Sequence, residues 1–114
     1  MNIKDLTTKD IAKLIRSDLK DEFGRNVKFS VRTKYFSMGS EINITIKSAK
    51  SSLFKEDGNR IENLNTEVVD KIKSIVDKYQ VTESDPYTDY YYANFYNHIG
   101  DWNEKIGKFY IERI

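Results

Sequence analysis

Few residues of this chain could carry out chemistry, and they are dispersed. Its single histidine, His98, lies three residues before Asp101, and a lone histidine is far more often a packed or surface residue than a general base. Cysteine is absent, which excludes thiolate nucleophiles and cysteine-ligated metals. The carboxylates of Glu83, Asp85 and Asp89 lack the spacing and the glycine of a calcium loop, so a solvated acidic turn is favoured. We therefore expect no enzymatic activity, no metal and no cofactor.

Short catalytic or nucleotide-binding motifs are also missing. The sequence contains no Walker loop, dinucleotide fingerprint or nucleophile elbow. Its 114 residues, with a formal charge of +1 and 39% hydrophobic residues, predict one globular domain over residues 1–114. A dedicated nucleic-acid binder usually shows a basic excess, which is not present here. Neither an apolar signal segment nor a membrane-spanning run is found, so we expect a cytoplasmic protein without membrane contact.

One group of side chains stands above this background, because it combines flat aromatic rings with cations. If the strand alternation is read correctly, its members share the open face of a sheet. Such a surface can stack bases or bind a protein, although tyrosines on a sheet can also form cross-strand pairs that only stabilise it. Because the net charge is close to zero and tyrosine is enriched in protein interfaces, we rank a protein partner above nucleic acid. The members are Tyr90, Tyr92, Tyr96, Lys28, Arg32 and Lys47.

A hairpin is the first element needed to position this group. Residues 27–32 and 42–47 alternate apolar and polar side chains around a turn that contains Gly39. The polar face, with Lys28, Arg32 and Lys47, stays open if only one side of the sheet is covered. The apolar face consists of Val27, Phe29, Val31, Ile42, Ile44 and Ile46.

Two helices are expected to cover the apolar face. Thr7 is a suitable N-cap with Asp10 at the third helical position, so the first helix begins near Thr8, and Gly24 ends it. The second helix begins at residue 65 or 66. Between hairpin and second helix, residues 48–64 predict a polar and mobile loop. The first apolar stripe is Ile11, Leu14, Ile15, Leu19 and Phe23, and the second is Val69, Ile72, Val76 and Tyr79, widened by Val68 and Ile75.

The C-terminal third is dense in aromatic residues, which favours strands. We place one strand at about residues 89–98 and another at about 108–113, with a turn near Gly100. Because both faces of the first of these strands carry aromatic residues, its phase rests on the assumption that Asn94 faces outward. That phase buries Tyr91, Ala93, Phe95, Phe109 and Ile111.

The resulting element order is α-β-β-α-β-β. It predicts an α+β two-layer sandwich, with an antiparallel sheet and two helices on one of its faces. We expect one shared core between the helices and the hairpin. Its expected members are Phe29, Val31, Ile42, Ile44, Leu14, Leu19, Ile72 and Val76.

Two sequence segments carry a resemblance to a known family. The runs Phe-Ser-Val-Arg at residues 29–32 and Ser-Met-Gly-Ser at 37–40, after the helix with Ile15, Leu19 and Phe23, resemble the large polyvalent protein-associated domains. The tyrosine-rich run at 89–96 is similar to their C-terminal strand. The likeness covers most of the chain and departs between residues 48 and 65, where such domains are expected to have a shorter connection.

This resemblance implies a role in a phage, plasmid or conjugative element, often as part of a large protein thought to protect the element from host defences. It implies no catalytic residues. A free-standing copy of this size resembles small anti-restriction and anti-CRISPR proteins. We expect a non-enzymatic inhibitor or accessory protein that binds a host defence protein, most concretely an anti-CRISPR protein acting on an RNA-guided nuclease. The alternatives are a nucleic-acid-binding accessory domain that uses the open sheet face, and a structural dimerisation module. The protein would be a monomer or a homodimer.

Overall fold

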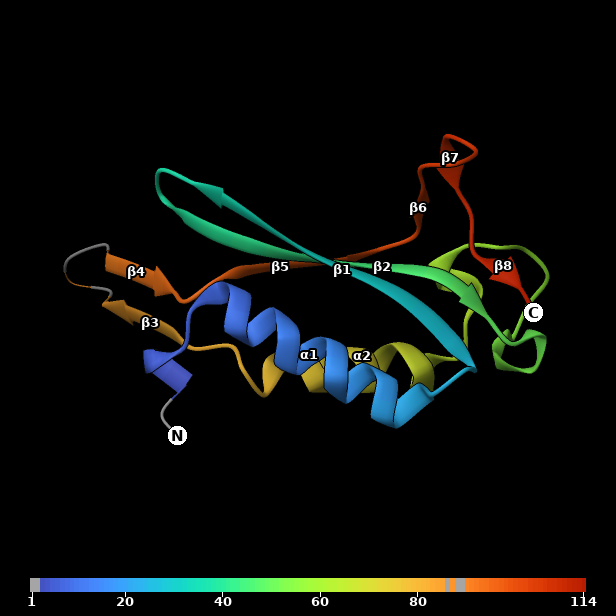
Figure 1. Cartoon of the computed structure of the whole chain (residues 1–114), viewed down its shortest axis with the longest axis horizontal. Coiled ribbons are helices and arrows are strands. Elements are labelled where there is room, and N and C mark those ends of the chain that lie inside the picture. The colour runs from blue at the N-terminus through green and yellow to red at the C-terminus, as the bar shows by residue number, and fades with distance from the viewer. Residues whose placement is uncertain (1–2, 86, 88–89) are drawn as a thin grey trace.

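Two helices lie beneath one face of a central sheet in the computed structural model, which describes residues 3–85, 87 and 90–114 (Figure 1). This arrangement confirms the predicted α+β class and the placement of both helices on the same face. The helices are α1, Thr8–Phe23, and α2, Thr66–Asp77. The sheet contains β1, Val27–Phe36, β2, Gly39–Ala49, β5, Tyr96–Gly100, and β8, Glu112–Arg113.

Helix α1 starts where its capping residues predict. The Thr7 hydroxyl accepts a hydrogen bond from the Asp10 amide at 3.1 Å, and the Asp10 carboxylate accepts one from the Thr7 amide at 3.3 Å. A turn of 3₁₀ helix, Ile3–Asp5, precedes it. The predicted stripe is wrong in one position, because Leu14 is only partly buried while Ala12 is buried against the core. A small residue at that position lets the helix lie close to the sheet.

The hairpin is longer than predicted and otherwise follows its alternation. Strands β1 and β2 pair antiparallel, with Val31 opposite Ile44, and their pairing continues to Phe36 and Gly39. The alternating isoleucines of β2 are fully buried against the helices, as predicted. A bulge shifts the register near the base of the hairpin, which leaves Lys47 without a partner residue in β1.

The central sheet is mixed, which corrects the expectation of an antiparallel sheet. Strand β5 pairs with β2 in parallel, from Glu41 opposite Tyr96 to Thr45 opposite Gly100, and β8 also pairs with β2 in parallel. The chain leaves β2, returns along α2 beneath the sheet and re-enters from the same end, and such a helical crossover joins parallel strands.

The single strand predicted at residues 89–98 is two strands. Strand β4, Tyr90–Ala93, pairs with β3, Thr82–Asp85, in a separate antiparallel ribbon, and β5 begins only at Tyr96. Asn94 separates the two strands. Its side-chain oxygen accepts from the Val81 amide at 2.9 Å and its side-chain nitrogen donates to the Tyr79 carbonyl at 2.8 Å. Asn94 therefore faces inward, contrary to the predicted phase, because it satisfies the backbone that leaves α2.

The predicted strand at 108–113 is also divided. Its first part is β7, Lys108–Phe109, which pairs with β6, Trp102–Asn103, in a short arm, and its second part is β8. Phe95 and Ile111 are fully buried, as predicted, but Phe109 is 51% exposed on the arm and its expected burial is wrong. The side chain of Tyr91 lies outside the described residues.

The connection at residues 48–64 is anchored rather than a free polar loop. It contains two 3₁₀ turns, Ser51–Leu53 and Ile61–Asn63, and Phe54 forms a bridge with Leu64. The Arg113 guanidinium donates to the carbonyls of Glu56, at 2.8 Å, and Gly58, at 2.6 Å. The C-terminal strand thus holds this segment against the sheet.

A polar cluster joins the two helices. The Asp18 carboxylate of α1 accepts hydrogen bonds from Lys78, at 2.8 Å, and from the Tyr79 hydroxyl beyond the end of α2. Partial burial opposes ionisation of Asp18, but the two hydrogen bonds outweigh it and lower the pKa of this carboxyl below its usual value. Burial and the Asp18 charge raise the pKa of Tyr79. Among the described residues, neither helix is long and apolar enough to cross a membrane.

Candidate functional site

Only part of the predicted tyrosine and cation group gathers on one face. Arg32 pairs with Asn43, which pairs with His98, so these three residues form a row across β1, β2 and β5. The neighbouring row contains Tyr96 at the end of β5. Because the residues facing the helices lie at the alternate positions, both rows belong to the sheet face that the helices leave uncovered. Arg32 and Tyr96 are therefore on the same open face, as predicted.

The other four predicted residues are not brought to this place. Lys28 and Lys47 are exposed at the opposite end of the hairpin, beside the bulge. Tyr92 is 38% exposed on β4, which belongs to the separate ribbon, and the side chain of Tyr90 lies outside the described residues. The break at Asn94 removes these tyrosines from the central sheet, so the continuous tyrosine and cation surface does not form.

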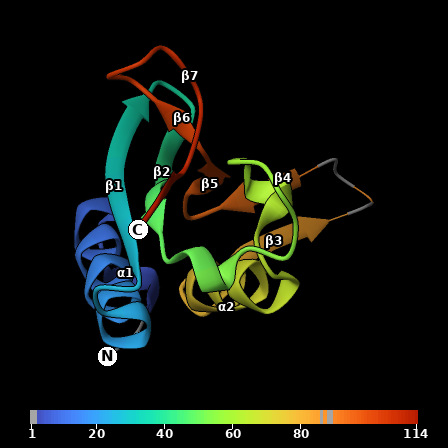
Figure 2. The same ribbon diagram turned by 90° about the vertical axis from the view of Figure 1, so that its right-hand side faces the viewer.

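The structure shows instead exposed apolar side chains on both faces of the distal end of the hairpin and in its turn, which we call the tip patch. Figure 2 shows the hairpin rising away from both helices. The fractional exposures are Tyr35 61%, Phe36 41%, Met38 86% and Tyr96 44%. Large aromatic and methionine side chains are enriched in protein interfaces relative to the rest of a protein surface.

The tip patch is held in place by its own elements. The rings of Phe36 and Tyr96 stack with centroids 6.1 Å apart and an interplanar angle of 23°. Gly39 adopts a φ of 152°, and the Tyr96 ring lies 3.6 Å from the position a side chain there would occupy. At the base of the patch, the hydroxyls of Thr8 and Ser40 form a buried hydrogen bond that ties the hairpin to α1. Phe36 and Tyr96 are therefore held on strands, whereas Met38 lies in the turn between β1 and β2.

Charges of both signs lie on the open face beside the tip patch. The Arg32 guanidinium donates to the Glu104 carboxylate at 3.0 Å, and the Asn43 amide donates to the Glu41 carboxylate at 3.0 Å. The side chains of Arg32 and Glu104 are 66% and 67% exposed, so this ion pair contributes little to stability. Such a mixed surface favours a polar protein contact over a polyanion.

The arm formed by β6 and β7 bounds the other end of the open face (Figure 1). Trp102 and Phe109 meet edge to face with centroids 5.0 Å apart, and the Arg60 guanidinium lies 4.7 Å from the Phe109 centroid. Asp101, which is buried, accepts from Arg60 at 3.0 Å and from the Ile61 amide at 2.8 Å. Asp101 is thus a structural anchor for the arm and not part of an exposed acidic surface.

The imidazole of His98, the single histidine of the chain, packs against the backbone of its own strand. The His98 ring lies over Gly100, where an added β-carbon would meet the imidazole Cε1 at 2.8 Å. No group of three histidine, cysteine or carboxylate side chains within the described part of the chain could hold a metal ion. The predicted acidic turn around Asp85 and Asp89 falls on residues whose side chains lie outside the described ones.

The alternation of β1 could have indicated the tip patch. Residues 32–36 continue the strand pattern past Arg32, and two aromatic residues follow directly before the turn. The predicted strand ends at Arg32 and the predicted turn covers residues 37–40, so Tyr35 and Phe36 are assigned to neither, and Met38 is assigned to the turn. The exposure of Tyr35, on the helix-facing side of the hairpin, could not be predicted, because it depends on where α1 begins.

Comparison with known protein families places this surface in context. The model of the large polyvalent protein associated domain 29 matches residues 6–112, which is nearly the whole chain and includes the anchored connection. This chain belongs to that family. Members of a large polyvalent protein associated domain family are associated with mobile genetic elements, and the match confirms the resemblance carried by residues 29–32 and 37–40. No curated protein and no solved structure matches the chain.

Proposed function

We propose that this domain is a non-enzymatic binding module of a mobile genetic element, and that it uses the tip patch to bind a host protein in the cytoplasm. The observation that carries the proposal is the stacked pair Phe36 and Tyr96, which remains 41% and 44% exposed although both residues lie on ordered strands. Leaving large aromatic rings in water gains nothing for folding, whereas binding energy concentrates in aromatic and arginine anchors.

The most concrete form of this proposal is an inhibitor of a host defence protein, such as an anti-CRISPR protein acting on an RNA-guided nuclease. Family membership supports the link to a mobile element, and the near-neutral charge of the chain supports a protein partner. An inhibitor of this kind can act by contact alone, because blocking a nucleic-acid channel or holding a nuclease domain in place prevents cleavage. Arg32, next to the tip patch on the open face, would add a charged contact.

The test begins with capture of a partner from host lysate on the immobilised domain, followed by mass spectrometry. Affinity for the purified partner is then measured for Phe36→Ala and Tyr96→Ala, with Lys73→Ala on the exposed side of α2 as the control. We expect each tip variant to weaken binding by about tenfold or more, since an anchor residue commonly contributes over 1 kcal/mol. Binding unchanged by both tip variants would contradict the proposal.

A nucleic-acid-binding role is the second candidate, because Arg32 and Lys34 lie on the same open face as Tyr96. If phosphate contacts supplied affinity, binding of a single-stranded oligonucleotide would fall steeply as salt rises and would drop in the Arg32→Glu variant. We expect no oligonucleotide binding at physiological salt. Tight and salt-sensitive binding would favour this second candidate over the first.

A dimerisation module is the third candidate, since two copies of the chain could bury their tip patches against each other. Light scattering of the purified domain over a range of concentrations measures the mass in solution. A monomer that binds its partner with the tip patch is the expected result. A dimer that Phe36→Ala dissociates would show that the patch serves self-association.

A further inference from the structure

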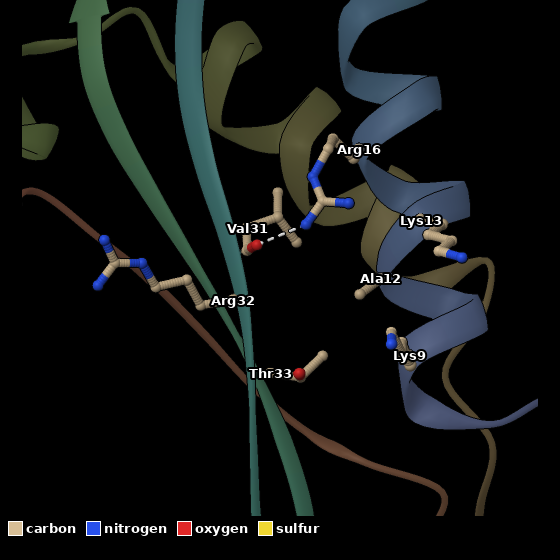
Figure 3. Close-up of a pocket in the computed structure, with 7 residues that line it drawn as sticks. All are labelled: Lys9, Ala12, Lys13, Arg16, Val31, Arg32 and Thr33. Carbon is tan, nitrogen blue, oxygen red and sulfur yellow. Dashed lines mark hydrogen bonds between the residues drawn. The ribbon is translucent and has the colours of Figure 1, made fainter.

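A second surface lies between α1 and the outer side of β1. It is a groove of about 330 Å³, and Figure 3 shows α1 along one side and β1 along the other. The groove is open to solvent and is distinct from the tip patch. Its lining residues are Lys9, Ala12, Lys13, Arg16, Val31, Arg32 and Thr33.

The groove is positively charged although the whole chain is nearly neutral. Lys9, Lys13 and Arg16 follow one another at four- and three-residue intervals, which places them along one side of α1. No carboxylate lines the groove. Arg32 contributes less to this charge, because its side chain points away from the groove and pairs with Glu104. The three helix cations therefore form a local charge with no acidic counterpart in the lining.

The opposite wall of the groove is the edge of a sheet. Within the described part of the chain, no strand pairs with the outer side of β1. The Val31 carbonyl points outward, because it accepts a hydrogen bond from the Arg16 guanidinium at 2.7 Å (Figure 3). Backbone groups two residues along an antiparallel edge point the same way, so the amide and carbonyl of Thr33 also face outward.

We propose that this groove binds an extended, acidic segment of a partner protein, which adds as a strand to the edge of β1. The peptide backbone would pair with the outward groups of Val31 and Thr33, and its carboxylates would meet Lys9 and Lys13. Ala12 also lines the groove between these cations, but its side chain is buried against the core. As a partner contact the proposal rests on the proposed function, but the groove's chemistry can be tested alone.

The composition of the groove favours a peptide over nucleic acid. Grooves that bind single-stranded nucleic acid combine cations with aromatic side chains that stack the bases, and no aromatic residue lines this groove. A peptide strand instead requires an unpaired sheet edge, which β1 supplies. The groove also leads towards the tip patch, since Tyr35 follows Val31 and Thr33 at strand spacing.

Arg16 has a particular role in this proposal. In the free protein its guanidinium donates a hydrogen bond to the Val31 carbonyl. This bond reduces the tendency of the exposed sheet edge to pair with other chains. An incoming strand would donate an amide to that carbonyl, and the released guanidinium could then bind a carboxylate of the same strand. Arg16 would thus exchange an internal hydrogen bond for a charged intermolecular one.

The probe is a short fluorescent peptide of alternating glutamate and threonine, and its binding to the full chain is followed by polarisation at low salt. A second peptide carries N-methyl groups at alternate amides, which removes backbone donors without changing the charge. We expect the first peptide to bind, and to bind about tenfold less tightly after Lys13→Glu or after N-methylation. Lys73→Glu, the same charge change on the exposed side of α2, should leave its affinity unchanged.

Three results would overturn the inference: no binding of the acidic peptide, equal binding of both peptides, or tighter binding of a deoxythymidine strand of equal charge that Lys13→Glu abolishes. Equal binding would show attraction by charge without strand addition, and the third result would show a phosphate site. Phe36→Ala separates this inference from the tip-patch proposal. Because it lies outside the groove, it should leave peptide binding intact, so either surface can fail without the other.

Discussion

The two ends of the β1–β2 hairpin carry similar apolar side chains with opposite surroundings. Near the helices, Ile42, Ile44 and Ile46 are fully buried between the sheet, α1 and α2. At the tip, Phe36, at the end of β1, is 41% exposed, and Met38, in the turn, is 86% exposed. Burial explains the first group as a source of stability, at about 25 cal/mol per Å² of apolar surface removed from water. The second group gains less stability from burial, and a partner surface is the physical explanation we propose for its exposure.

The largest effect on stability is expected in the buried part of the hairpin. Ile44→Ala removes a fully buried side chain and should lower the free energy of unfolding by roughly 2–5 kcal/mol, because it loses transfer free energy and leaves a cavity. Denaturant unfolding measures this loss. Thr45→Ala, one residue along on the opposite face, is the control and should change stability by less than about 1 kcal/mol. Equal losses in both variants would mean that the two faces are not distinct.

A smaller effect is expected at the anchor of the arm. Asp101→Ala leaves the Ile61 amide and the Arg60 guanidinium without their buried acceptor, which should cost about 1–3 kcal/mol. Glu104→Ala removes a carboxylate from an exposed ion pair three residues later and should cost less than about 1 kcal/mol. Thermal melting of the two variants compares them. If Glu104→Ala proved the more damaging, the arm would be held by the open face instead.

The stability of the protein should also depend on acidic pH through the polar cluster that joins the two helices. The lowered pKa of Asp18 means that its ionised form is stabilised in the folded protein, so its contribution is present above the usual carboxyl pKa and is lost as pH falls through the folded pKa. Asp18→Asn should therefore flatten the decline of stability below about pH 4. Unfolding midpoints at several acidic pH values provide the measurement. A variant that declines like the wild type would show that the Lys78 and Tyr79 contacts do not couple to folding.

The smallest effect on stability is expected at the tip patch. Met38→Ser changes a side chain that is 86% exposed, and it should shift the free energy of unfolding by less than about 0.5 kcal/mol. The same variant should weaken partner binding, because methionine supplies adaptable apolar contact. Calorimetric melting and an affinity measurement are made on the same preparation. Loss of stability comparable to that of Ile44→Ala would place Met38 in the core and not on a binding surface.

The sequence predicted the parts of the fold that depend on local rules. Thr7 and Asp10 cap α1 as expected, and the alternation around Ile44 determines which hairpin face is buried. These features succeed because capping and periodicity act over a few neighbouring residues. The family resemblance rested on the N-terminal half and on the tyrosine-rich run at residues 89–96, and it was confirmed.

The errors arose where distant contacts decide the outcome. Asn94 divides the aromatic segment because its side chain binds the backbone at Tyr79 and Val81, a contact that no local pattern shows. This division moved Tyr92 away from Arg32, so most of the predicted site dispersed. Parallel pairing of β5 likewise depends on how α2 returns the chain, and the exposure of Tyr35, on the helix-facing side of the hairpin, depends on where α1 begins.

Site-specific photo-crosslinking tests the central claim most directly. A photoreactive amino acid replaces either Met38 in the tip patch or Asp70 on the exposed side of α2, and each protein is irradiated with its partner. We expect an adduct from position 38 that Phe36→Ala abolishes, and none from position 70. An adduct from position 70 alone, or adducts of equal yield from both positions, would contradict the assignment of the binding surface to the tip patch.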